Sequence, residues 1–164
     1  MMSKLLKSCL VSAVFAGAQA FAAGPAPAVA EHGSKAEAQE MVKKALALIK
    51  SAGPEAAYKT FTEHPNGAFK DRDLYVFVYD FQGNCLAQGA NPKMVGRNFI
   101  DLKDIEGREL LKDQVKMIKA KNAGWYGPYK FNNPVTNKVD TKEAYCERGV
   151  GDTYLCVGAY SSSN

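Results

Sequence analysis

Apolar residues recur at helical spacing in the part of the chain that follows residue 33. They form one face of a predicted helix that begins at Ser34 and stops at Gly53-Pro54, and they are Ala38, Met41, Val42, Ala45, Leu48 and Ile49. The run Ser34-Lys35-Ala36-Glu37 fits a capping box, in which the serine and glutamate side chains satisfy free backbone amides at the helix start. A second, shorter helix is predicted over residues 55–62.

The pattern changes to that of strands after residue 74. Residues 75–79, Tyr-Val-Phe-Val-Tyr, are apolar at every position, so we expect a strand that is buried on both faces in the middle of a sheet. Turn-forming residues follow at 80–84, and residues 85–87 return as a shorter strand. This pattern predicts a hairpin.

A third helix and three more strands are predicted in the rest of the chain. The helix begins at Asp104 or a neighbour and ends at Asn122, with a lysine-rich solvated face and an apolar face formed by Leu110, Leu111, Gln114, Val115 and Ile118. The strands cover residues 125–131, 139–148 and 153–159. Because residues 75–79 and 153–159 are apolar on both faces, we expect an antiparallel sheet with both runs inside it.

The first 22 residues have the pattern of a cleaved secretory signal. Lys4 and Lys7 precede an apolar run over residues 10–18, and small residues typical of a cleavage site lie at 18–20 and 20–22. An uncleaved anchor is the alternative, but the run is shorter than the ~20 residues that a spanning helix needs. Residues 23–33 follow as a flexible leader rich in Pro and Ala. We therefore expect a periplasmic or secreted protein with no membrane insertion after processing.

Charge and length narrow the class of protein. The 164-residue chain carries a formal charge of +4, which falls when Lys4 and Lys7 leave with the signal, and basic and acidic residues are interspersed. No basic stripe is formed, so binding to nucleic acid or to a membrane surface is not indicated. The ~140 residues left after cleavage suffice for one domain.

Residues suited to catalysis or metal binding are sparse. His32 and His64 have no Cys or carboxylate at the spacing of a metal site, and no run for covalent haem attachment is present. No nucleophile elbow or phosphate loop occurs. Helix capping is the expected role of the acidic pairs Asp71/Asp73 and Asp101/Asp104. We expect no enzyme, no metal site and no cofactor.

Several short motifs occur in order over roughly residues 35 to 160. They are Y-V-F-V-Y-D-F-Q-G-N-C-L-A at 75–87, N-P-K-M-V-G-R-N at 91–98, D-L-K-D-I-E-G at 101–107, Gly124-Trp125 with Tyr129, Asn133-Pro134, Lys142 with Tyr145, and V-G-A-Y at 157–160. In this combination the chain resembles the extracytoplasmic single Cache sensor domains. The resemblance implies a PAS-like α+β fold with a central antiparallel sheet of about five strands and a long N-terminal helix packed behind it. One domain then covers residues 34–160, with residues 161–164 as a tail.

Aromatic residues on the predicted strands are candidate walls of a pocket, because a small-ligand site needs concave apolar surface with a few polar groups. The candidates are Tyr75, Phe77, Tyr79, Trp125, Tyr129 and Tyr145. Trp125 and Tyr129 lie four residues apart on one strand, which predicts that they share a face. The alternative is that these aromatics only fill the core.

Two cations are candidates for binding a ligand carboxylate. Lys142 shares a strand face with Ala144 and Cys146 and points away from Tyr145 if the strand is unbroken. Arg97, in a predicted loop, offers bidentate geometry, although exposure at the surface is the alternative for it. The family resemblance implies short organic acids as the ligand class.

Three cysteines remain after processing: Cys85, Cys146 and Cys156. Export permits a disulfide, and a turn centred on Gly151 places Cys146 and Cys156 directly opposite each other. A cross-strand bridge with Cys85 unpaired is one prediction, and three buried thiols are the alternative.

The functional hypothesis is a sensor in signal transduction, of the kind used in chemotaxis. It binds a small organic acid and acts through a separate transmembrane receptor or kinase partner. The alternative is a structural or protein-interaction module with the same fold and a filled pocket.

Overall fold

The computed structural model describes residues 32–63, 65 and 67–161. The predicted signal, most of the predicted leader, His64 and residues 162–164 lie outside the described residues. The elements in chain order are α1 (Lys35–Ala52), α2 (Pro54–Glu63), β1 (Lys70–Asp71), β2 (Leu74–Asp80), β3 (Cys85–Gln88), the short 3-10 helix η1 (Pro92–Met94), α3 (Leu110–Lys121), β4 (Ala123–Asn132), β5 (Val139–Arg148) and β6 (Thr153–Ser161).

The strands form one antiparallel sheet with the order β1-β2-β6-β5-β4, and β3 pairs with β2. The predicted antiparallel α+β fold is confirmed, with β2 and β6 in the interior of the sheet. The sheet has six strands where about five were expected. The additional strand, β1, is only two residues long, which is too short for any alternation of apolar and polar residues to show in the sequence.

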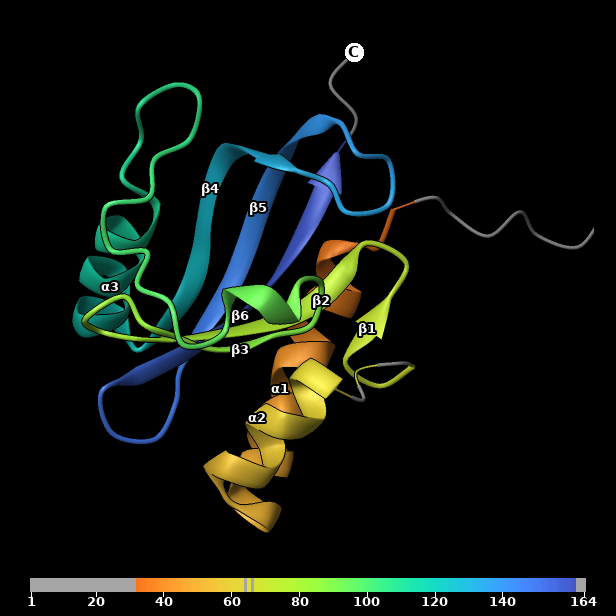
Figure 1. Ribbon diagram of the computed structural model, residues 1–164, viewed down its shortest axis with the longest axis vertical. Coiled ribbons are helices and arrows are strands. Elements are labelled where there is room, and N and C mark those ends of the chain that lie inside the picture. Colours follow the sequence, from red (N-terminus) through yellow and green to blue (C-terminus); the bar gives the residue numbers. More distant parts are fainter. Residues whose placement is uncertain (1–31, 64, 66, 162–164) are drawn as a thin grey trace, which may run out of the picture.

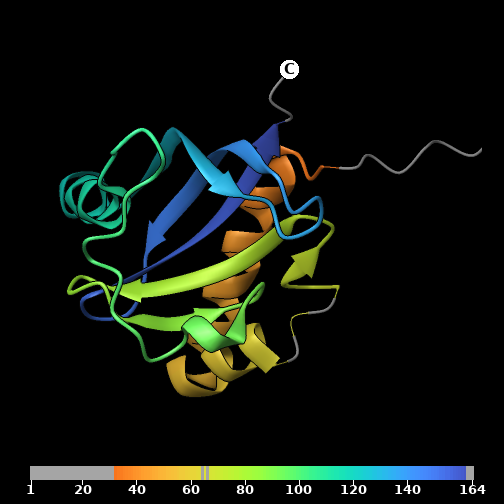
Figure 2. The ribbon, with the colours of Figure 1, turned by 45° about the horizontal axis from the view of Figure 1, so that its top comes forward.

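The sheet separates two apolar layers (Figures 1 and 2). The helices α1 and α2 cover one face, where Val76 and Val78 of β2 are fully buried. The other face carries Tyr75, Phe77 and Tyr79 of the same strand, and α3 packs over it beside β4 and β5. The prediction that β2 is buried on both faces is therefore confirmed, and α1 is the long helix expected behind the sheet.

The start and end of α1 follow the sequence signals. The Ser34 hydroxyl accepts a hydrogen bond from the Glu37 amide, and the Glu37 side chain accepts one from the Ser34 amide, so the capping box is present. The helix ends at Gly53, whose φ of 82° is costly for residues that carry a Cβ atom.

The helix α3 begins at Leu110, six residues later than the predicted start at Asp104. The Asp104 carboxylate instead accepts hydrogen bonds from the amides of Glu106, Arg108 and Lys130. These contacts hold a tight turn and attach it to β4, so the acidic residue caps a loop and not a helix. The prediction for the start of this helix was wrong because Asp104 satisfies backbone amides equally well in either setting.

The hairpin of β5 and β6 has the register expected from its glycine-rich turn. Cys146 pairs directly with Cys156, and the two form a disulfide. Cys85 is a buried free thiol.

A register shift interrupts β4. Tyr126 pairs with Ala144 and Tyr129 pairs with Lys142, so β4 spends three residues where β5 spends two. This extra residue lies at Gly127-Pro128, and it reverses the side-chain alternation downstream. Trp125 and Tyr129 therefore lie on opposite faces of the sheet, and the prediction that they share one was wrong.

Candidate ligand-binding site

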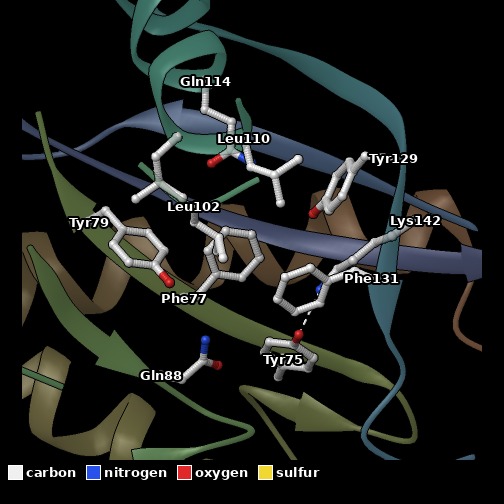
Figure 3. A pocket seen from close by; sticks show the side chains of 11 residues that line it. Tyr75, Phe77, Tyr79, Gln88, Leu102, Leu110, Gln114, Tyr129, Phe131 and Lys142 are labelled. Atoms are coloured by element: carbon white, nitrogen blue, oxygen red, sulfur yellow. Dashed lines mark hydrogen bonds between the residues drawn. The ribbon is translucent and has the colours of Figure 1, made fainter. Parts of the chain in front are cut away.

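A small cavity lies between the aromatic face of the sheet and α3 (Figure 3). Its volume is about 20 Å³, which is room for roughly one water molecule. The lining residues come from β2 (Tyr75, Phe77, Tyr79), β3 (Gln88), β4 (Tyr129, Phe131), β5 (Lys142), and from α3 with the loop before it (Leu102, Leu110, Leu111, Gln114). The walls are mostly apolar, and a few polar groups converge inside them.

Lys142 is the central polar residue of the cavity, with only 1% of its surface exposed. Its ammonium donates hydrogen bonds to the hydroxyls of Tyr75 at 2.7 Å and Tyr160 at 3.0 Å. No carboxylate among the described residues forms an ion pair with it. Burial lowers the pKa of Lys142 to about 7, and the more distant Asp73 carboxylate opposes this only in part.

Glycine at position 158 leaves the space that the Lys142 side chain occupies. A Cβ atom added to Gly158 would lie 1.9 Å from Lys142 Cε, far inside van der Waals contact. Gly158 pairs with Ala144 on the neighbouring strand, so the lysine crosses the sheet surface over two small residues. The small residues Gly158 and Ala144 thus leave room for the Lys142 side chain to extend into the aromatic layer.

Three further hydrogen-bond donors reach the cavity. Tyr129 is 4% exposed, and its hydroxyl makes no hydrogen bond to any described residue. Gln88 accepts a bond from the Ala90 amide, while its own amide nitrogen contacts only the Met94 sulfur at 3.8 Å. Gln114 accepts a bond from the Tyr154 hydroxyl, and its amide nitrogen has no hydrogen-bond partner among the described residues. Together with Lys142, these groups make the cavity rich in donors.

Five of the eight candidate ligand residues line this cavity: Tyr75, Phe77, Tyr79, Tyr129 and Lys142. Lys142, Ala144 and Cys146 share the buried face opposite Tyr145, as their spacing predicts. The sequence reasoning did not identify Gln88 or Gln114 as site residues. For Gln114 a signal existed, because it is a polar residue on the apolar face of a helix.

The other three candidates lie elsewhere. Trp125 and Tyr145 pack against each other with ring centroids 5.4 Å apart, in the layer that α1 covers. Arg97 is exposed in the loop after η1, where its guanidinium lies 5.8 Å from the Phe99 ring centroid. The structure thus brings one of the two candidate cations into the cavity and leaves the other at the surface.

An outer groove of about 410 Å³ adjoins the cavity. Tyr75, Gln88 and Phe131 line both spaces and form the boundary between them. The groove runs between η1 and the loop that joins β4 to β5, and Asn91, Asn132 and Asn137 add polar groups to its walls.

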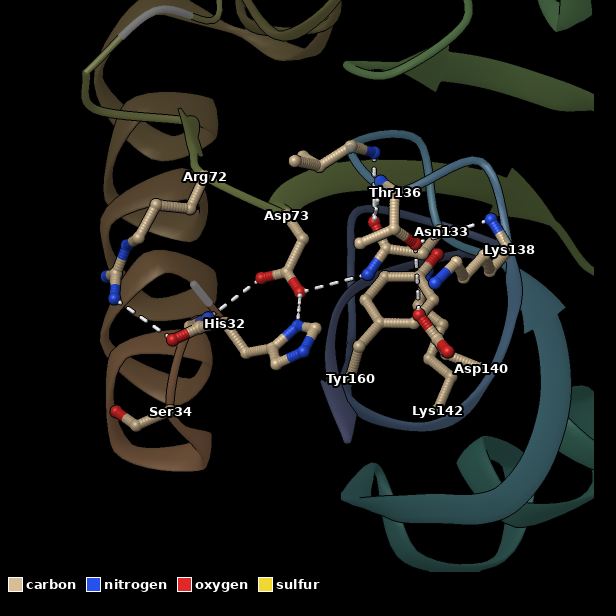
Figure 4. A network of polar contacts seen from close by, with 12 residues as sticks. His32, Ser34, Arg72, Asp73, Asn133, Thr136, Lys138, Asp140, Lys142 and Tyr160 are labelled. Atoms are coloured by element: carbon tan, nitrogen blue, oxygen red, sulfur yellow. Dashed lines mark hydrogen bonds and ion pairs between the residues drawn. The ribbon is translucent and has the colours of Figure 1, made fainter. Parts of the chain in front are cut away.

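A buried polar network lies beyond Tyr160 (Figure 4). The Tyr160 hydroxyl donates to the Asn132 carbonyl, and the Asn133 side chain donates to the Asp73 carboxylate at 3.2 Å. Asp73 is fully buried and also contacts His32 Nδ1 at 2.6 Å and the Gly33 amide at 2.8 Å. It therefore holds the segment before α1 against the sheet, a role different from the helix capping predicted for it.

The described residues contain neither a cluster of metal ligands nor a helix suited to span a membrane. No three His, Cys, Asp or Glu side chains within residues 32–63, 65 and 67–161 are grouped as metal ligands would be. None of the helices in the same ranges has the length and apolar character to cross a bilayer.

Solved structures with a similar fold include sensor domains of chemotaxis proteins. A methyl-accepting chemotaxis protein from Vibrio parahaemolyticus superimposes with a TM-score of 0.62 at 23% identity, over 77% of this chain and 87% of that one. A structure described as a Cache chemosensory domain that recognises carboxylic acids gives a TM-score of 0.60 at 21% identity, over 77% and 88% of the two chains. The periplasmic sensor domain of a chemotaxis protein gives 0.61 at 17% identity, over 77% and 90%. At these identities the likeness establishes the fold alone.

Sequence comparison identifies the family of this chain. The sensor histidine kinase MctS of Rhizobium johnstonii is 30% identical over 74 residues, which is 45% of this chain but only 16% of that kinase. The profile of the family described as Single Cache domain 2 matches residues 27–162. With five-sixths of its length matched in this way, the chain belongs to the Single Cache domain 2 family.

Proposed function

We propose that this protein is an extracytoplasmic sensor module that binds a short organic acid in the cavity beside Lys142. The observation that carries the proposal is a fully buried ammonium whose partners are two tyrosine hydroxyls and no carboxylate. An ammonium has three donors, and here one is left for a ligand. A carboxylate is the ligand group that would supply both the missing acceptor and the missing negative charge.

The other donors support the same ligand class. The Tyr129 hydroxyl and the amide nitrogens of Gln88 and Gln114 face the cavity without nitrogen or oxygen partners among the described residues. Burial raises the pKa of Tyr129 well above its usual value, so this hydroxyl keeps its proton and donates. A small anion with two or three acceptor oxygens would satisfy these groups together.

Output through a partner is part of the proposal. One similar protein is named as a sensor histidine kinase, of which this chain spans about a sixth, and a protein of similar fold is named as a methyl-accepting chemotaxis protein. We propose that the acid-bound module acts on a transmembrane receptor or kinase. The signal-like residues 1–22 support export, and the mature protein is then expected to begin at Phe21 or Ala23. Intact-mass measurement of periplasmic protein tests this, and retention of Met1 would contradict it.

One observation favours the second candidate, a structural or interaction module with a filled pocket. The cavity holds roughly one water molecule, whereas an acid of two to four carbons needs several times that space. Binding therefore requires the side chains at the groove boundary, Gln88 and Phe131, to move. If they do not move, the cavity is part of the core.

A thermal-shift screen of two- to four-carbon organic acids and of amino acids separates the two candidates. We expect at least one acid to raise the melting temperature of the wild-type protein, because a ligand that binds only the folded state stabilises it. Lys142→Met should remove the shift, and Arg97→Met, which deletes an exposed cation, should keep it. If both variants respond as the wild type does, the carboxylate proposal fails. If no acid shifts the wild type, the filled pocket is the better account.

A further inference from the structure

The lysine in the cavity is buried without a counter-charge. Lys142 is 1% exposed, and its hydrogen-bond partners, the Tyr75 and Tyr160 hydroxyls, are neutral. Four aromatic rings surround Nζ at centroid distances of 4.2 to 5.2 Å, from Tyr75, Tyr160, Phe131 and Phe77. These rings attract a cation, but they do not replace the hydration that an ammonium has in water.

The titratable groups nearest to Lys142 do not balance its charge. Burial raises the pKa of Tyr75 on β2 to about 12 and raises the pKa of Tyr160 on β6 and of Tyr129 on β4, so all three stay neutral around pH 7. The two nearby acids have other partners. Asp73 binds His32, Gly33 and Asn133, and Asp140 accepts from the Thr136 hydroxyl.

The remaining walls of the cavity contribute no charge. The helix α3 presents Leu110, Leu111 and the Gln114 amide, and β3 presents the Gln88 amide. An anion that entered beside a neutral amine would be buried without a counter-charge, and an ammonium in the empty cavity already lacks one. Each state alone is costly, whereas the two charges together compensate each other.

We propose that acid binding at this site is coupled to proton uptake, so that one carboxylate and one proton enter the cavity together. In the balanced step, RCOO⁻ and H⁺ from solvent combine with the neutral Lys142 amine to give a carboxylate bonded to the Lys142 ammonium. No covalent bond between protein and acid forms. The inference rests on the proposed function and adds that the site responds to acid and pH jointly.

The coupling predicts a specific pH dependence of affinity. Below pH 7 the amine already carries its proton and the affinity should be nearly constant, because the pKa of Lys142 is about 7. Above that value each pH unit should weaken binding about tenfold, since the proton must be taken from a tenfold lower concentration. Proton uptake per bound acid should be about 0.9 at pH 8 and about 0.1 at pH 6.

Calorimetry with acetate, propionate and butyrate tests this on the full mature chain. Titrations at pH 8 in phosphate and in Tris give the number of protons taken up, because the observed enthalpy varies with the ionisation enthalpy of the buffer. We expect close to one proton in the wild type and none in Lys142→Arg, which is charged at every pH used. Acid binding without proton uptake in the wild type would overturn the coupling and leave the proposed function intact.

A direct titration of Lys142 tests the same coupling without requiring that the Lys142→Arg variant folds. With ¹³C-labelled lysine, the Lys142 Cε signal is identified by its loss in Lys142→Met, and its midpoint is followed from pH 5 to 11. We expect a midpoint near 7 in the empty protein and a rise of about three pH units with saturating acid, as an uptake of about 0.9 proton at pH 8 requires. A midpoint above 9.5 in the empty protein overturns the coupling alone. If the midpoint is near 7 and none of the three acids binds, the proposed function and the coupling both fail.

Discussion

Lys142 is costly to the empty protein, and this cost should appear in the stability. Its pKa is about 7 in the folded protein and has the ordinary value of 10.5 in the unfolded chain. The destabilisation is therefore complete below pH 7, and it is relieved as the pH rises from 7 toward 10.5, where the folded protein binds fewer protons than the unfolded chain.

Lys142→Met should therefore be more stable than the wild type at pH 6, by an amount on the order of a few kcal/mol. The advantage should shrink by about 1.4 kcal/mol per pH unit between pH 7 and 10. The Tyr75 and Tyr160 hydroxyls remain hydrogen-bonded to each other at 3.1 Å, so no orphaned group offsets the gain. Urea unfolding at several pH values measures the difference. Lys116→Met, at an exposed site on α3, is the control, and an advantage that does not vary with pH would contradict the argument.

Gly158 should be as important as Lys142 for binding. In Gly158→Ala the new Cβ atom would lie 1.9 Å from Lys142 Cε, so the lysine must leave its position. We expect loss of acid binding and a stability decrease of about 1–3 kcal/mol. Gly124→Ala is the matched control, because its Cβ would only touch the Met117 sulfur at 3.4 Å. If steric conflict is the cause, adding Lys142→Ala should restore most of the lost stability, and purely additive effects would refute it.

The irregular part of β4 decides which of its aromatic residues faces the cavity. Tyr129 faces the cavity, and Trp125 packs with Tyr145 beneath α1. We expect Tyr129→Phe to weaken acid binding about tenfold with little effect on stability, because it removes one hydrogen bond to a charged group. Trp125→Ala should lower the melting temperature but leave the affinity nearly unchanged. Calorimetry and thermal unfolding of both variants give the comparison, and a reversed pattern would place the binding site on the α1 side.

The elements differ in how far their sequences predict them. The α1 capping box, the continuous apolar run of β2 and the register that pairs Cys146 with Cys156 depend on residues close in sequence, and each was predicted. The late start of α3 was not, since the Asp104 carboxylate is committed to an amide on β4, which is 26 residues away. The extra residue in β4 was not predicted either. A strand is recognised by side chains that alternate between two faces, and one inserted residue reverses this alternation.

At the scale of the molecule, the cavity and the segment before α1 are joined by polar contacts. Lys142 binds Tyr160, Tyr160 binds the Asn132 carbonyl, and the adjacent Asn133 binds Asp73. Asp73 in turn holds His32 and Gly33. An acid that moves Lys142 or the loop between β4 and β5 can therefore alter how this segment is held. The sequence did not predict the connection, because its members come from five separate parts of the chain: residues 32–33, 73, 132–133, 142 and 160.

Asp73→Asn tests whether the contacts of Asp73 with His32, Gly33 and Asn133 stabilise the fold. The substitution keeps the size of the side chain but replaces one carboxylate oxygen with an amide nitrogen, which cannot accept from Asn133 at the same position. We expect a stability decrease of about 1–3 kcal/mol and faster hydrogen exchange at the first turn of α1, because a buried network loses an acceptor. Asp71→Asn is the control, since Asp71 is half exposed and its ion pair with Arg72 contributes at most about 1 kcal/mol. Equal effects of the two substitutions would show that Asp73 has no special part in holding the segment. Asp73→Asn could also lower global stability more than the control while hydrogen exchange at α1 stays unchanged. That result would mean that Asp73 stabilises the sheet and does not hold the segment before α1.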